Sequence, residues 1–205
     1  MPKMICESQR LEDYLEASAE VDYHEPGVVG LAARLKAQAV DGVDYARRVF
    51  EFVRDEVSHS WDLQSSRVTC RASDVLEHRE GICYAKSNLV AALLRAQEIP
   101  AGFCYQRLTL GDTPDTGYCI HALNAVYIAS LDRWIRVDAR GNKEGIDAQF
   151  SLDVDEEKLA FPIRPEYDER DYGVIYAKPN AKTIETLRSH SDCVVMYRNG
   201  LPADL

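Results

Sequence analysis

The segment from residue 81 to residue 100 limits most strongly how this 205-residue chain can fold. Gly81 interrupts the preceding sequence. From Cys83 to about Gln97, apolar residues recur at the three- and four-residue steps of a helix, and Pro100 stops the pattern. The apolar stripe consists of Ala85, Leu89, Ala92, Leu93 and Ala96. Such a stripe has to be buried, so we expect a helix that packs against the core and begins at Cys83.

Helices are expected before this segment, and an antiparallel sheet is expected after it. Apolar spacing and turn residues predict helices over 28–39, 44–57, 73–77 and 181–190, and strands over 103–110, 119–128, 133–138 and 172–177. This order predicts an α+β fold in which N-terminal helices pack on the sheet. We expect one domain over residues 1–205, with its core motifs at about 45–140 and a C-terminal extension from about 141.

Composition narrows the function classes. The formal net charge is −10 and the pI is about 5.0, which disfavours nucleic acid as a partner because that binding relies on Lys and Arg. No apolar stretch is long enough for a membrane span, and the start of the chain lacks the apolar core of a signal peptide. The six cysteines form no C-x-x-C pair. These features predict a cytoplasmic protein with reduced thiols, no membrane partner and no metal site.

Three residues in chain order suggest a nucleophile, a base and a group that orients the base. Cys83 begins the long helix, where the positive end of the helix dipole favours a thiolate. His121 and Asp138 lie in the two expected strands that follow. A hairpin that turns at Ala129 and Ser130 would place His121 directly opposite Asp138 on one face of the sheet, whereas a slip of one residue would separate them. This set predicts a thiol acyl-transfer site.

The chain resembles the transglutaminase-like superfamily, a branch of the papain-like cysteine fold. The resemblance covers roughly residues 45–140 and rests on three blocks in the order that this superfamily shows: 72–76 (Ala-Ser-Asp-Val-Leu), 81–86 (Gly-Ile-Cys-Tyr-Ala-Lys) and 91–102, which contains Ile-Pro-Ala, with a His strand and an Asp strand after them. Tyr84 and Leu123 depart from residues common in the family, which leaves the substrate open. The tail around 164–167 resembles a bacterial subgroup.

The resemblance implies that Cys83 is the nucleophile, His121 the base and Asp138 the orienting acid. It implies acyl transfer from an amide or peptide bond, with hydrolysis favoured over cross-linking and a peptide, protein or small amide as substrate. The backbone N–H of Cys83 is a natural oxyanion donor, and a second donor is expected upstream, at Gln64 or Trp61. No acidic cluster resembles a calcium loop, so no cofactor or metal is expected.

Three alternatives stay open at this stage. His59 is a rival base, although it precedes Cys83 and so has the wrong order for the family. The fold could serve as a catalytically silent peptide-binding or scaffold domain, against which the complete set of three residues argues. Finally, Cys83, His121 and Asp138 could be zinc ligands, which a zinc assay on purified protein tests.

Overall fold

The computed structural model describes residues 4–205, so the first three residues of the segment assessed for an export signal lie outside the description. The helices are α1 (Pro26–Gln38), α2 (Gly42–Glu56), α3 (Ala72–His78), α4 (Cys83–Arg95), α5 (Ala181–Ser189) and α6 (Cys193–Asn199). The strands are β1 (Ile5–Cys6), β2 (Ser58–His59), β3 (Glu80–Gly81), β4 (Ala101–Thr109), β5 (Tyr118–Ile128), β6 (Arg133–Val137), β7 (Arg170–Asp171) and β8 (Val174–Ile175). The predicted α+β fold is confirmed.

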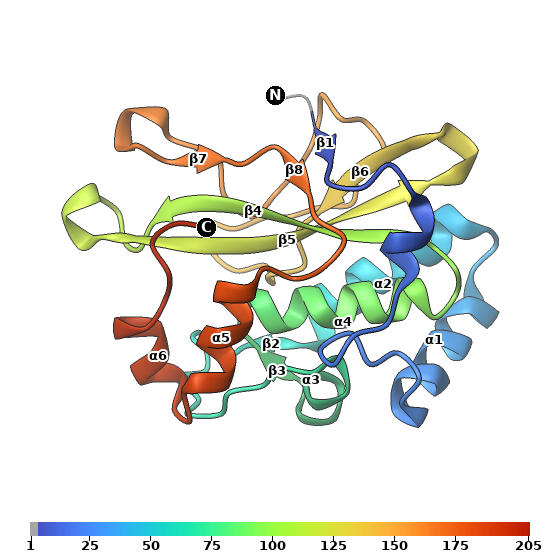
Figure 1. Cartoon of the computed structure of the whole chain (residues 1–205), viewed down its shortest axis with the longest axis horizontal. Coiled ribbons are helices and arrows are strands. Elements are labelled where there is room, and N and C mark those ends of the chain that lie inside the picture. The colour runs from blue at the N-terminus through green and yellow to red at the C-terminus, as the bar shows by residue number, and fades with distance from the viewer. Residues whose placement is uncertain (1–3) are drawn as a thin grey trace.

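The main sheet is antiparallel and has the strand order β6-β5-β4-β7. The helices gather on one side of it, while β1 and β8 lie toward the other side (Figure 1). Two short parallel pairs, β1 with β8 and β2 with β3, were not expected from the sequence. A strand of two residues is too short to show an alternating pattern of apolar and polar residues, so tertiary packing decides how it pairs.

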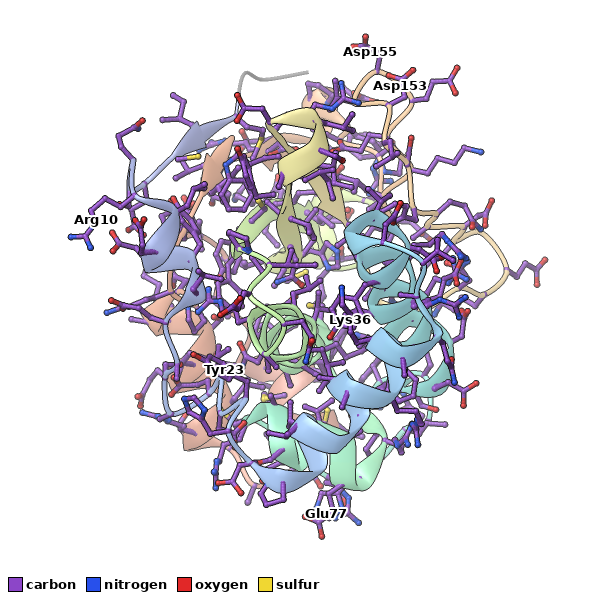
Figure 2. All side chains as sticks on the ribbon, turned by 90° about the vertical axis from the view of Figure 1, so that its right-hand side faces the viewer. Arg10, Tyr23, Lys36, Glu77, Asp153 and Asp155 are labelled. Carbon is purple, nitrogen blue, oxygen red and sulfur yellow. The ribbon has the colours of Figure 1, made fainter. Side chains whose placement is uncertain are left out.

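Helix α4 is the central helix of the fold. Every residue from Cys83 to Arg95 is buried, including the polar Lys86 and Asn88. In Figure 2 this helix is seen end-on in the middle of the molecule, with strands above it and α1 and α2 to its right. The largest apolar cluster runs from Val21 to Met196, so residues of the C-terminal extension pack on the same core. The predicted apolar stripe therefore underestimates how completely this helix is enclosed.

The register of the β5–β6 hairpin differs from the expected one. The connection holds four residues, with a 3-10 turn over Ala129–Leu131 and Asp132 in the left-handed conformation at a φ of 48°. Ile128 consequently pairs with Arg133, two positions away from the expected register, and Asp138 is not directly opposite His121. A shift of two residues keeps every side chain on its original face. The His–Asp pair therefore survives as diagonal neighbours.

Within residues 4–205, none of the helices combines the length and the apolar character that a membrane crossing requires.

Candidate active site

The start of α4 is fixed by close packing around Gly81. A Cβ at this position would lie 2.9 Å from Thr69 Oγ1 and 3.2 Å from Ala85 Cβ, so only glycine fits without a shift. Ile82 is extended, at φ −77° and ψ 171°, and no side chain caps the helix. The first backbone N–H groups of α4 lack intrahelical acceptors, so the thiol of Cys83 stands beside free donors at the positive end of the helix.

His121 and Asp138 form a buried pair. The Nε2 atom of His121 is 2.8 Å from Oδ2 of Asp138, and both side chains are almost completely buried. The carboxylate also accepts hydrogen bonds from the backbone N–H groups of Ala160 and Arg140, at 3.0 and 3.3 Å. The ring of Phe161 meets the ring of His121 edge-on, with centroids 5.1 Å apart. The segment around residue 160 thus holds this pair away from water.

The ionisation of His121 follows from its two neighbours. Burial lowers the pKa of His121, but the charges of Asp138 and Cys83 and the hydrogen bonds to both outweigh it, so the pKa lies above its ordinary value. Burial likewise opposes ionisation of Asp138, yet the charge of His121 and three hydrogen bonds keep the pKa of the carboxyl below its ordinary value. Since Asp138 takes Nε2, Nδ1 is the ring nitrogen left for Cys83. His121 thus lies between two partners, Asp138 and Cys83.

The other cysteines lack such a partner. Burial raises the pKa of Cys6, and it raises those of Cys70 and Cys193 to about 11 and that of Cys119 to about 12. Burial also raises the pKa of Cys104 far above its ordinary value. All six cysteines are free thiols. Cys83 differs from the other five because a buried imidazole faces it.

A cavity of about 510 Å³ opens over Cys83 and His121. Its walls come from five parts of the chain: β2 with the segment after it, the start of α4, the β4–β5 hairpin, the stretch 140–169, and α6 with the segment after it. Trp61 and Tyr197 stack in one wall, with ring centroids 4.3 Å apart. The ion pair of Arg140 with Asp62 joins the stretch 140–169 to the segment after β2, and the ion pair of Arg164 with Glu169 lies within that stretch. The volume suits a single small ligand or one acyl chain.

The structure separates the two residues expected to supply a second oxyanion donor. Trp61 lines the cavity, but Gln64 is exposed, and its amide donates to the backbone carbonyl of Trp61 at 2.5 Å. Gln64 is therefore not brought to the cavity. His59, considered as a rival base, is buried in the cavity wall. Tyr197 and Leu201 of the C-terminal extension also line the cavity, and no sequence motif marked them.

A buried lysine supports the loop that carries Asp138. The ammonium of Lys86, one turn after Cys83, donates to the backbone carbonyls of Val57 and Arg140 at 2.5 and 2.9 Å. Burial and the charge of Arg140 lower the pKa of Lys86 to about 7. These bonds connect α4 to the end of α2 and to the residues that follow Asp138. The family motif around Cys83 contained this lysine, but the sequence did not indicate its role.

Among residues 4–205, no three His, Cys, Asp or Glu side chains are placed to hold a metal ion. The geometry of the site gives the reason. Asp138 and Cys83 contact different edges of the His121 ring, so their donor atoms do not converge on one point. A zinc ion requires such convergence.

Comparisons with known proteins agree with the fold. Residues 29–139, more than half of the chain, match the family model of the transglutaminase-like superfamily. No curated protein matches the chain. A candidate cysteine protease from Cytophaga hutchinsonii is similar in structure, with a TM-score of 0.53 and 21% identity over 65% of this chain and 43% of that protein. This chain therefore spans less than half of that relative.

Two further solved structures are more distantly similar. The periplasmic domain of TgpA from Pseudomonas aeruginosa gives a TM-score of 0.46 at 19% identity, over 62% of this chain and 45% of that one. A TGase gives a TM-score of 0.41 at 17% identity, over 65% of this chain and 35% of that one.

Proposed function

Because this chain belongs to the transglutaminase-like superfamily, we propose that it is an enzyme that transfers an acyl group from an amide or peptide bond through Cys83, His121 and Asp138. The observation that carries the proposal is the buried His121–Asp138 pair, whose ring has Cys83, at the N-terminus of α4, as its other partner. The raised pKa of His121 favours an imidazolium beside the thiol, and an imidazolium stabilises a thiolate.

The reaction then proceeds in two halves. Cys83 Sγ bonds to the carbonyl carbon, and the carbonyl π-electrons move onto oxygen. When the tetrahedral species collapses, the C–N bond breaks and the departing amine takes a proton from His121, which leaves a thioester on Cys83. Water attacks the thioester while His121 accepts a proton from it. The C–S bond then breaks as this second tetrahedral species collapses, the acid product leaves, and the Cys83 thiolate and the His121 imidazolium are restored.

Hydrolysis is the outcome that we favour over cross-linking. Cys83 is only 8% exposed, at the floor of a cavity that suits one acyl chain. A protein-bound amine would need a second approach to the thioester, whereas water needs no binding surface of its own. The cavity volume fits a peptide or small amide whose acyl part packs against the apolar residues of the walls.

Truncation of the thiol tests the proposal. Cys83→Ala is expected to abolish turnover of activated amides, esters and thioesters, because no covalent intermediate can form. Cys104→Ala is the matched control, since Cys104 is a buried cysteine outside the cavity. Circular dichroism and thermal unfolding of both variants report the fold.

Full activity of Cys83→Ala would exclude the thiol mechanism. A wild-type protein that binds a peptide but turns over no amide, ester or thioester in a broad panel would instead support the scaffold alternative.

A further inference from the structure

His59 is held beside the start of the nucleophile helix. It lies on β2, which pairs in parallel with β3, and its partner in the register is Gly81, two residues before Cys83. The next residue along, Ser60, donates its backbone N–H to the carbonyl of Gly81 at 3.3 Å. The side chains of His59, Cys83 and His121 all line the same cavity. The backbone pairing thus fixes the imidazole ring of His59 in the wall of the cavity that contains Cys83.

The ring of His59 has unused hydrogen-bonding capacity. The side chain is 5% exposed, and its Nδ1 atom is buried without a partner among residues 4–205. Buried polar atoms almost always have a partner, and unpaired N–H groups are rarer than unpaired acceptors. The less costly tautomer therefore keeps Nδ1 as the bare acceptor and carries its proton on Nε2. That N–H is then the donor that the ring offers to the cavity.

The environment keeps this imidazole neutral. Burial and the charge of Arg140 lower the pKa of His59 well below its ordinary value, with smaller lowering from Lys86 and His121 and an opposing effect of Asp62. A ring of this kind is a poor base for the thiol. Its role differs from that of His121, whose carboxylate partner Asp138 favours the charged form. A neutral donor suits an oxyanion, because it can bond the negative oxygen without losing a proton to it.

We propose that His59 is a catalytic residue that donates its Nε2–H to the oxyanion formed when Cys83 attacks the substrate carbonyl, together with the backbone N–H of Cys83. This assignment rests on the proposed acyl-transfer function. The oxygen gains its charge from the carbonyl π-electrons as the Sγ–C bond forms, and it returns them when the C–N bond breaks. No proton moves to or from His59 in either step.

The experiment separates oxyanion stabilisation from activation of the thiol. His59→Phe keeps a ring against Tyr197, whose centroid is 6.1 Å from that of His59, but it has no N–H. His59→Gln loses the ring and keeps an N–H donor. Each variant is assayed for hydrolysis of an activated ester and for the rate at which iodoacetamide alkylates Cys83 at pH 6. Alkylation displaces iodide and builds no oxyanion, so it reports the thiol alone.

We expect His59→Phe to lower kcat by about 10²–10³-fold, with alkylation of Cys83 within about threefold of wild type. We expect the kcat of His59→Gln to be at least about tenfold higher than that of His59→Phe, because an amide N–H also bonds an oxyanion. The unchanged alkylation rate would show that the site is still folded. If His59→Phe fails to fold, His59→Leu replaces it in the same pair of assays.

Three outcomes would overturn the assignment. A kcat for His59→Phe near the wild-type value would mean that His59 donates nothing. A parallel loss of alkylation in folded protein would make His59 a base or a support for the thiol. Trp61→Phe is assayed in the same way, and a loss of kcat in this variant but not in His59→Phe, with alkylation retained, would identify Trp61 as the donor. Failure of the underlying function looks different, because then Cys83→Ala would keep full activity or the wild type would be inactive.

Discussion

The substitution Asp138→Asn should disable the site without changing its shape. The carboxylate accepts three N–H groups: Oδ2 takes those of His121 and Ala160, and Oδ1 takes that of Arg140. An asparagine has one oxygen and one NH₂ group. Its NH₂ group must therefore replace one carboxylate oxygen and face at least one of these N–H donors. If the amide nitrogen faces His121, the ring has to carry its proton on Nδ1, and it then no longer offers a base to Cys83.

The contacts of Asp138 determine how much stability and how much activity the substitution should remove. At least one buried N–H loses its acceptor, which costs about 1–3 kcal/mol of unfolding free energy. Loss of the orienting carboxylate should lower kcat by about 10⁴-fold, equivalent to about 5.5 kcal/mol of barrier. The pKa of His121 should fall, because burial then acts without the charge of Asp138. Less imidazolium at pH 6 means slower alkylation of Cys83.

Three measurements on the same preparation check this reasoning: ester hydrolysis, urea unfolding, and iodoacetamide alkylation of Cys83 at pH 6. His59→Phe is the informative comparison, because it should lower hydrolysis but not alkylation, whereas Asp138→Asn should lower both. If Asp138→Asn keeps hydrolysis and alkylation within about threefold of wild type, the carboxylate neither orients nor charges His121, and the reasoning is wrong.

Three further outcomes are expected. Iodoacetamide at pH 6 should modify Cys83 well before Cys119, whose pKa burial raises to about 12; mass spectrometry of the labelled peptides decides this. Lys86→Met should destabilise the fold more at pH 9 than at pH 6 in urea unfolding. The pKa of Lys86 is lowered to about 7 in the folded chain, so above that pH the unfolded chain binds the extra proton, and the stabilising contribution of Lys86, which the variant lacks, grows as pH rises. Gly141→Ala should cost about 1–3 kcal/mol at its φ of 113°, while Gly30→Ala, in an open helical position, should cost nothing; equal thermal shifts for the two would contradict this.

The sequence predicted the parts of the site that lie on long elements. Cys83 was placed at a helix start by a glycine break and an apolar stripe, and both signals are local. His121 and Asp138 were placed on one face of a hairpin although the expected register was wrong by two residues. The reason is the period of two in strands, because an even error preserves the face. The four-residue turn with Asp132 in the left-handed conformation carried no clear composition signal.

The walls of the cavity could not be predicted in the same way. Tyr197 belongs to α6, which has only seven residues, and a helix that short shows less than two turns of period. Its N-cap, Asp192, accepts a hydrogen bond from the backbone N–H of Val195, but an aspartate alone does not predict a helix start. His59 lies on a two-residue strand whose partner follows more than twenty residues later. Such contacts depend on packing between distant segments, which no window of local sequence contains.

The backbone N–H of Ile120, next to His121, donates to the carbonyl of Pro202 at 2.9 Å, and Tyr197 and Leu201 complete the cavity wall. A ribosome makes the strands that carry His121 and Asp138 well before it makes these residues. The chamber above the thiol and its imidazole is therefore complete only when this last stretch of the chain has been made. Under the proposed function, the reacting groups thus belong to residues 83–138, whereas the C-terminal extension shapes the space that an acyl group enters.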